Sequence, residues 1–241
     1  MAERAVWSSL DLILPPRCEN CRRFGERLCA LCRDEIEYIA DPICGRCGYP
    51  ASASAPTTDD CDQCRRRPFN GRGMRSLALH GGPLRRAIHS LKYRHNPPLS
   101  EVLAGMMDRR WPSALPRDAV LIPVPLSAER MKERGFNQAE LLARHLGARR
   151  RRPVLTRALR RVRATQSQVG LTAEDRQSNV RGAFAADQDQ ARDLCIVLID
   201  DVCTTGATLS ACAAALLKMD AREVWAYTLA RARFDSADPL L

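Results

Sequence analysis

One stretch of the chain places two adjacent carboxylates between an apolar segment and a turn of small, hydroxyl-bearing residues. Residues 195–199 predict a buried strand, Asp200 and Asp201 follow it, and Thr204-Thr205-Gly206 leads past Thr208 into a predicted helix. Such a turn can bind phosphate, because backbone N–H groups converge there, the helix dipole adds positive potential and threonine hydroxyls donate. The carboxylates repel phosphate and suit a sugar diol or a divalent metal ion. The stretch therefore predicts a site for a phosphoribosyl group.

The alternative is an ordinary strand, turn and helix that carries acids at its edge. Thr-Thr-Gly is a poor choice for turn formation alone, where Asn or Asp would serve. The composition of the turn therefore favours a ligand site over a plain connection.

Eight of the eleven cysteines precede residue 65 and form four Cys-x-x-Cys pairs. The pairs are Cys18/Cys21, Cys29/Cys32, Cys44/Cys47 and Cys61/Cys64. Each pair can place two thiolates on one tetrahedral ion, so four pairs predict two structural zinc sites without an open position for substrate. A disulfide framework would need an oxidising compartment, and no targeting signal is evident. Cys195, Cys203 and Cys212 have no paired spacing; we expect small core residues and, at Cys203, a spacer within the turn.

The sharing of the two ions among the four pairs has two solutions. Sequential sharing joins the first two pairs and the last two pairs, whereas a cross-braced arrangement interleaves them. Sequential sharing closes shorter loops and is preferred on that ground. With few large apolar residues, this segment is expected to depend on its metal ions for folding.

A second candidate phosphate contact follows the predicted strand at residues 119–125. Arg130, Lys132 and Arg134 lie in a predicted loop, and Gln138 lies at the start of the helix predicted over residues 136–146. Guanidinium groups match phosphate oxygens, so this loop is predicted to clamp a pyrophosphate. A solvated basic turn is the alternative.

A third segment, residues 164–182, is poor in large apolar residues and long enough to form a mobile lid over the site. A plain loop is the equal alternative. Its candidate ligand contacts are Thr165, Gln166, Gln168, Arg176 and Asn179.

Most of the chain's net charge of +10 comes from one arginine-rich run. Nine arginines and no acid lie between Arg144 and Arg163. Such a run favours a polyanion, with salt-sensitive and sequence-blind binding because no aromatic residues are interleaved. A solvated arginine-rich face is the alternative reading. The candidate nucleic-acid contacts are Arg149, Arg150, Arg151, Arg152, Arg160, Arg161 and Arg163.

Apolar strands that alternate with helices position these groups. Strands are predicted near residues 76–80, 119–125, 196–199 and 224–229, with helices between them, so the fold class is α/β with a mostly parallel sheet. Ligands bind beyond the carboxyl ends of such strands, where Asp200 lies. We expect a short N-terminal helix and double zinc ribbon in residues 1–70 and the α/β domain in residues 71–241. No apolar run is long enough to span a bilayer.

These motifs resemble those of one known family. The Asp-Asp-x-x-Thr-Thr-Gly-x-Thr run at residues 200–208 is similar to the 5-phosphoribosyl-1-pyrophosphate (PRPP) motif of type I phosphoribosyltransferases. Together with the cysteine pairs, it resembles the ComF family, competence-associated proteins with an N-terminal double zinc ribbon. Further matching motifs are Leu-Lys-Tyr-Arg at 91–94, Pro-Val-Pro-Leu-Ser at 123–127, Arg-Gly-Phe-Asn-Gln at 134–138 and Thr-x-x-Gln at 165–168.

The resemblance implies a type I phosphoribosyltransferase-like fold that binds PRPP with Mg²⁺, the ion being held chiefly by the ligand's own oxygens. It also implies a cytoplasmic role in the uptake or processing of transforming single-stranded DNA, with a DNA-uptake helicase or other competence proteins as partners. Asp200 and Asp201 would hold the ribose hydroxyls, and Arg134 would face the pyrophosphate with Arg130, Lys132, Gln138 and Gln168. The residues implied to bind the phosphoribosyl group are Asp200, Asp201, Val202, Cys203, Thr204, Thr205, Gly206, Ala207 and Thr208.

An active phosphoribosyltransferase with an unidentified acceptor, such as a purine or a salvage intermediate, is the alternative function. Pyrophosphate would then leave the sugar's C1, with Asp200, Asp201 and Arg134 as the catalytic residues. No residue stands out in the sequence as a nucleophile or a dedicated general base. The acceptor, the oligomeric state and the protein partner do not follow from the sequence.

Overall fold

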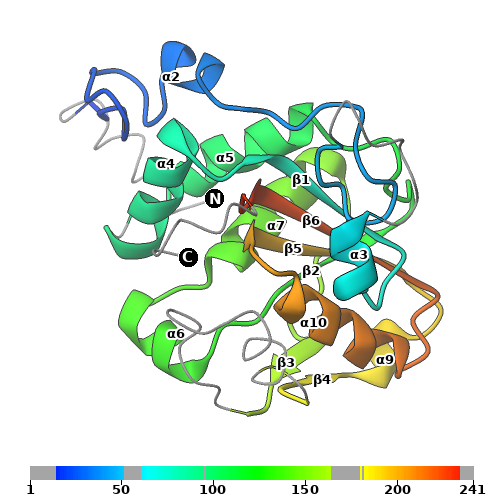
Figure 1. Ribbon diagram of the computed structural model, residues 1–241. Helices are drawn as coiled ribbons and strands as arrows, with labels where there is room; N and C mark the ends of the chain where they lie inside the picture. Colours follow the sequence, from blue (N-terminus) through cyan, green and yellow to red (C-terminus); the bar gives the residue numbers. More distant parts are fainter. Residues whose placement is uncertain (1–14, 52–60, 95, 164–179, 181, 234–241) are drawn as a thin grey trace.

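A parallel sheet of four strands forms the centre of the molecule (Figure 1). The computed structural model describes residues 15–51, 61–94, 96–163, 180 and 182–233. The strand order is β1-β6-β5-β2, and every neighbouring pair is parallel. The strands are β1 (Gly73–Leu79), β2 (Val120–Pro123), β5 (Cys195–Cys203) and β6 (Glu223–Arg231). The predicted α/β class with a parallel sheet is confirmed.

Helices cover both faces of this sheet, and each face has its own buried core (Figure 1). One face packs against α4 (Gly82–Tyr93), α5 (Leu99–Arg109) and α7 (Gln138–Arg150). The other packs against α10 (Ala207–Leu217), and a small antiparallel hairpin lies beside that helix. The hairpin strands are β3 (Leu159–Arg161) and β4 (Phe184–Ala186), and the short helix α9 (Gln188–Ala191) follows them.

The central strand β5 determines how the two adjacent carboxylates are oriented. Its side chains alternate between the cores: Val197 and Ile199 contribute to the core under α4 and α7, and Ile196 and Leu198 to the core under α10. Because successive side chains of a strand point to opposite faces, Asp200 and Asp201 leave the sheet in opposite directions. The two acids therefore have different surroundings although they are adjacent in sequence.

The prediction of a loop between β2 and α7 is wrong, because residues 128–134 form the helix α6 (Ala128–Arg134). The Ser127 side chain accepts a hydrogen bond from the Arg130 N–H and begins the helix. Gly135 ends it in the left-handed region, with a φ of 75°. Arg130, Lys132 and Arg134 are thus fixed on a helical turn instead of a loop.

Two other expectations fall on residues outside the described part of the chain. The predicted N-terminal helix lies in residues 1–14, and the lid residues 164–179 include Gln168. Both stay predictions, as does the domain boundary at residue 70. Among the helices of the described residues, none is long and apolar enough to cross a bilayer.

The cysteine-rich segment contains the short helices α2 (Ala30–Asp34) and α3 (Asp62–Arg66) and packs on both faces of the sheet. Cys18, Cys29 and Cys32 belong to the core under α4, whereas Cys44 and Cys47 belong to the core under α10. The connection between them runs antiparallel along β1, where the Ile39 N–H donates to the Leu77 carbonyl at 3.1 Å and the Leu79 N–H to the Glu37 carbonyl at 2.9 Å. The segment shares its buried side chains with the α/β core.

The opposite edge of the sheet is paired in a similar way. Beside β2, the Leu121 N–H donates to the Pro153 carbonyl and the Leu155 N–H donates to the Leu121 carbonyl, both at 2.9 Å. Irregular chain segments thus occupy the outer sides of both edge strands.

Candidate functional site

A cleft of about 800 Å³ opens at the carboxyl end of β5, between the turn before α10, the helix α4 and the helix α6. This is the position at which parallel sheets bind ligands, and the volume suits a small molecule. Of the residues implied to bind a phosphoribosyl group, all but one line it: Asp200, Asp201, Val202, Cys203, Thr204, Gly206, Ala207 and Thr208. Arg130, Arg134 and Gln138 line it as well.

The turn before α10 presents the start of a helix to this cleft. Gly206 is the residue before α10, in the left-handed region with a φ of 80°, which favours glycine. The first turn of α10 carries no acidic residue, so the positive end of its dipole is not neutralised there. A helix start of this kind is chemically suited to an anion.

Thr205 does not line the cleft. Its hydroxyl accepts a hydrogen bond from the Ala207 N–H at 3.3 Å, and the residue faces a second hollow of about 540 Å³ on the other side of α10. Its hydroxyl therefore stabilises the turn, and of the three threonines only Thr204 and Thr208 line the cleft.

Asp201 forms a buried ion pair. Its Oδ2 lies 2.9 Å from Nζ of Lys92 on α4, and the two side chains are 5% and 19% exposed. The charge of Asp201 is therefore compensated from within the protein.

Within the described part of the chain Asp200 has no direct ion pair, and its environment is less favourable to a charge. Burial, and then the negative charge of Asp201, raise the pKa of Asp200 to about 7; the hydrogen bond from the Asp201 N–H at 2.8 Å opposes the rise, as do Lys92 and Arg130. The two adjacent acids therefore differ in the structure. Asp201 is ion-paired with Lys92, whereas Asp200 is a carboxyl group whose ionised form a bound cation would favour.

Arg134 is anchored in the opposite wall of the cleft. The side chain is 5% exposed, and its guanidinium donates to Oε1 of Gln138 at 3.1 Å and to the Tyr93 hydroxyl at 3.3 Å. The same group lies 5.0 Å from the Tyr93 ring centroid, and that ring contacts His89 at 4.9 Å between centroids. Lys132 is exposed on α6 and does not line the cleft.

The arginine-rich run does not form one continuous surface. Nη2 of Arg149 lies 3.8 Å from Oε1 of Glu101, and Nη1 of Arg150 lies 2.8 Å from Oδ1 of Asp108. The guanidinium carbon of Arg150 also lies 4.5 Å from the ring centroid of Trp111. Arg161 lines the cleft. Arg152 is half-buried, whereas Arg151, Arg157, Arg160 and Arg163 are exposed.

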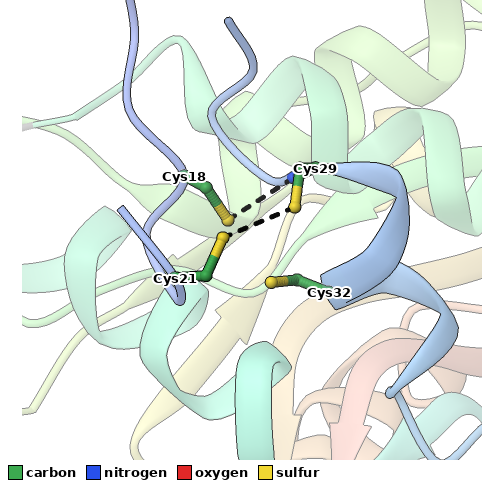
Figure 2. A group of neighbouring side chains, drawn as sticks. All are labelled: Cys18, Cys21, Cys29 and Cys32. Atoms are coloured by element: carbon green, nitrogen blue, oxygen red, sulfur yellow. Dashed lines mark hydrogen bonds between the residues drawn. The ribbon is translucent and has the colours of Figure 1, made fainter. Parts of the chain in front are cut away.

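The eight early cysteines form two tetrads that join consecutive pairs, as sequential sharing predicts. They are Cys18, Cys21, Cys29 and Cys32, the first cluster, and Cys44, Cys47, Cys61 and Cys64, the second cluster. Figure 2 shows the four side chains of the first cluster converging on one point. Within each tetrad the sulfur atoms lie within 4.8 Å of one another.

The sulfur geometry fits zinc. Zn–S bonds of about 2.3 Å in a tetrahedron require sulfur–sulfur separations of about 3.8 Å. The separation is 3.6 Å between Cys21 and Cys29, 3.8 Å between Cys44 and Cys64, and 3.5 Å between Cys47 and Cys61. A disulfide bond would need about 2.05 Å. Both tetrads can therefore bind zinc.

Backbone N–H groups lower the pKa of one cysteine in each cluster and so favour its thiolate form. Burial alone would raise the pKa of Cys18, but N–H groups of Cys29, Cys21 and Asn20 lower it to about 6. Against the same effect of burial, corresponding N–H groups in the second cluster lower the pKa of Cys44 to about 7. Because the thiolate is the form that binds metal, this arrangement favours metal ligation.

Sequence reasoning did not identify the partners of Asp201 and Arg134. Lys92 and Tyr93 belong to the Leu-Lys-Tyr-Arg motif, but that motif does not reveal a contact with residues more than forty positions away. His89, Glu129 and Glu133 also line the cleft, and no signal in the sequence marks them.

Comparison with known proteins places these features in a family. The double zinc ribbon domain family matches residues 9–65. Competence protein F of Haemophilus influenzae is 31% identical over 227 residues, which cover 90% of this chain and 97% of that protein. Competence protein ComFC of Bacillus subtilis is 30% identical over 235 residues, 95% of this chain and 91% of the relative. DNA utilization protein YhgH of Salmonella typhi is 30% identical over 232 residues, 91% of this chain and 99% of the relative.

Proposed function

Because the chain belongs to the ComF family, we propose that it is a zinc-containing protein that binds PRPP in the cleft and acts in the cytoplasm in the uptake or utilisation of DNA. The observation that carries the ligand assignment is the joint presence, in one cleft, of a helix-opening turn and the Asp200 carboxyl group. The names of the relatives support the biological role. The sulfur geometry of the two tetrads supports two zinc ions.

In this proposal the turn at residues 204–208 takes the 5′-phosphate, and Asp200 accepts hydrogen bonds from the ribose hydroxyls. Arg130 and Arg134 face the pyrophosphate, for which guanidinium groups are suited. A Mg²⁺ ion bound with the ligand would supply positive charge near Asp200.

The binding of PRPP is expected to strengthen as pH rises from 6 to 8. Asp200 accepts hydrogen bonds fully only when ionised, and its pKa is raised to about 7, so the competent form is scarce at pH 6 and dominant at pH 8. If only the ionised form binds, the association constant rises about tenfold over this interval. Isothermal titration calorimetry with Mg²⁺ and PRPP on the zinc-loaded chain measures the change.

Asp200→Asn separates this titration from that of the ligand's own phosphate. The variant is expected to bind at least about tenfold more weakly at pH 8 and to lose the part of the pH dependence that belongs to the carboxyl group. Asp118→Asn, at a surface ion pair with Arg222, is the matched control. Wild-type affinity in Asp200→Asn, or no binding of PRPP to the wild-type protein, would refute the ligand assignment.

We propose that the exposed arginines of the run contact single-stranded DNA. Replacing Arg151, Arg157, Arg160 and Arg163 together with serine is expected to weaken the binding of an oligothymidylate and to reduce its salt dependence. If all of them contact phosphates, the slope of log K against log salt falls by about 3. Fluorescence anisotropy over a salt series measures it.

Arg144→Ser is the control for this substitution, because Arg144 forms an ion pair on the same helix, with its Nη2 2.6 Å from Oε1 of Glu140. An unchanged salt slope in the fourfold variant would show that these arginines do not face DNA.

A transferase activity is the second candidate, and the size of the cleft favours it. Beyond the turn and Asp200, the cleft extends to His89, Tyr93 and Gln138, which leaves room for an acceptor beside a bound sugar. Magnesium-dependent release of pyrophosphate from PRPP with a panel of nucleobases decides between a catalyst and a binding protein. Release that is lost in Asp200→Asn supports the enzyme.

A further inference from the structure

Tyr93, the last residue of α4, exposes its aromatic ring in the cleft. The residue is 51% exposed, and among the large apolar side chains that are exposed in the described part of the chain it is the one that lines the cleft. PRPP consists of a sugar and phosphate groups and has no planar ring that could stack on an aromatic side chain. The proposed ligand therefore does not explain an exposed ring at this position.

Two neighbouring side chains hold this ring in place. Nη2 of Arg134 donates to the Tyr93 hydroxyl at 3.3 Å, and the guanidinium carbon lies 5.0 Å from the ring centroid. The ring of His89, one helical turn earlier on α4, lies 4.9 Å away between centroids, at an interplanar angle of 48°. Because the ring is already ordered, little conformational entropy is lost when a planar ligand stacks on it.

Arg134 gives an independent indication of a ligand at the same wall of the cleft. Its Nη1 donates to Gln138 and its Nη2 to Tyr93, but its Nε is buried and has no hydrogen-bond partner among the described residues. The side chain is 5% exposed and lines the cleft. A buried donor without an acceptor is costly, so we expect a molecule bound in the cleft to supply the acceptor. The edge of a purine ring presents such an acceptor at N7.

The end of α4 lies beside the acids at the carboxyl end of β5. Lys92, the residue before Tyr93, has its Nζ 2.9 Å from Oδ2 of Asp201. The turn before α10, the Asp200 carboxyl group and Tyr93 all line one cleft of about 800 Å³. These three features suit the three parts of a nucleoside 5′-monophosphate, which are a phosphate, a ribose diol and a planar base.

We propose that the Tyr93 ring stacks on a purine base, so that the cleft binds purine nucleoside 5′-monophosphates as well as PRPP. An acceptor at the edge of the base then satisfies Nε of Arg134. A purine is favoured over a pyrimidine because the larger ring system covers more of the aromatic side chain. This inference rests on the proposed function, because the phosphate and ribose contacts are those assigned to PRPP.

The first test measures what the base adds to binding. Isothermal titration calorimetry on the zinc-loaded chain with Mg²⁺ compares guanosine 5′-monophosphate, uridine 5′-monophosphate and ribose 5-phosphate. The guanosine nucleotide is expected to bind at least about fivefold more tightly than ribose 5-phosphate, which is the lower end of what the stacking of one base contributes. It is also expected to bind more tightly than the uridine nucleotide. Equal affinities for the guanosine nucleotide and ribose 5-phosphate, or a preference for the uridine nucleotide, would overturn the inference.

Two substitutions distinguish stacking on the ring from a positioning role of the Tyr93 hydroxyl. Tyr93→Phe keeps the ring and is expected to bind the guanosine nucleotide within about threefold of the wild-type affinity, whereas Tyr93→Leu removes the ring and is expected to lose at least about fivefold. If Tyr93 acted only by holding Arg134 through its hydroxyl, the two variants would lose affinity equally, and that result would refute the stacking. Because the residue is half exposed, both variants are expected to fold.

Phe24→Leu is the matched control for the loss of an exposed ring. Phe24 is 57% exposed, and the guanidinium carbon of Arg17 lies 4.1 Å from its ring centroid, as Arg134 lies near the ring of Tyr93, but Phe24 does not line the cleft. The variant is expected to bind the guanosine nucleotide with wild-type affinity. A loss as large as that of Tyr93→Leu would mean that the effect does not come from the cleft.

The comparison of two ligands separates this inference from the proposed function. PRPP has no planar ring and is expected to bind Tyr93→Phe and Tyr93→Leu with equal affinity. If the guanosine nucleotide binds through the Tyr93 ring but PRPP does not bind, the PRPP assignment fails and the role of the ring stands. If PRPP binds but the guanosine nucleotide gains nothing over ribose 5-phosphate, the inference fails and the proposed function stands.

Discussion

Chelation of the zinc ions from the purified protein is expected to lower the thermal unfolding midpoint by at least about 10 °C, in a single transition. Structural zinc contributes to folding directly, with apparent binding free energies of about 10–16 kcal/mol per site in small zinc domains. Here the cysteines also belong to both cores: Cys18 and Cys29 pack with Leu84, and Cys44 and Cys47 pack with Leu209. The loss of metal should therefore weaken the whole structure and not only the segment that carries the ligands.

Differential scanning calorimetry with and without a strong chelator measures the effect, and added Zn²⁺ should restore the midpoint. Cys212→Ala is the control: Cys212 is fully buried in α10 outside both clusters, so the variant keeps two zinc ions and remains sensitive to the chelator. Two separate transitions, with only the smaller one responding to chelator, would show that the cysteine-rich segment unfolds independently.

Replacing Lys92 with methionine is expected to destabilise the protein by about 3 kcal/mol at pH 7, because it leaves the Asp201 carboxylate buried without its partner. The Nζ to Oδ2 distance of 2.9 Å and the 5% exposure of Asp201 place this pair among the buried ones. Urea unfolding of the wild-type protein and the variant at pH 7 measures the difference.

The double variant Lys92→Met/Asp201→Asn is expected to be more stable than Lys92→Met alone, since it removes the unpaired charge. Arg144→Met, at the exposed pair with Glu140, is the control and should cost less than about 1 kcal/mol. A double variant no more stable than Lys92→Met would mean that lost packing, and not the uncompensated charge, causes the destabilisation.

The parts of the fold that follow from local patterns were predictable. The run at residues 195–199 is apolar on both faces, as a strand covered by two layers of helices must be, and β5 is such a strand. The four Cys-x-x-Cys pairs predicted the tetrads for the same reason, since each pair is a complete local unit.

Other features depend on contacts that no local pattern encodes. Residues 128–134 have too few apolar side chains for an amphipathic signal, although Ser127 and Gly135 mark both ends of α6. The strands of the β3–β4 hairpin are three residues each, too short for a periodic signal. The difference in charge compensation between Asp200 and Asp201 depends on the position of Lys92, which lies on α4 and is far from both acids in the sequence.

The arginine-rich run shows that the charge of a segment also does not predict its tertiary contacts. The arginine count predicts a cluster that binds a polyanion or a solvated arginine-rich face, whereas the tertiary structure pairs Arg149 and Arg150 with acids of α5 and brings Arg161 to the cleft. Net charge in a sequence measures composition; the fold decides which of the charges face solvent.

The pairing on the outer sides of β1 and β2 bears on how copies of the protein can meet. An open edge strand is a template for intermolecular β-pairing and for aggregation. Residues 37–39 and 153–155 already fill the hydrogen-bonding positions that such pairing would use at Leu77, Leu79 and Leu121. At these positions the sheet cannot be lengthened by a neighbouring molecule, so self-assembly there would have to proceed through side-chain surfaces.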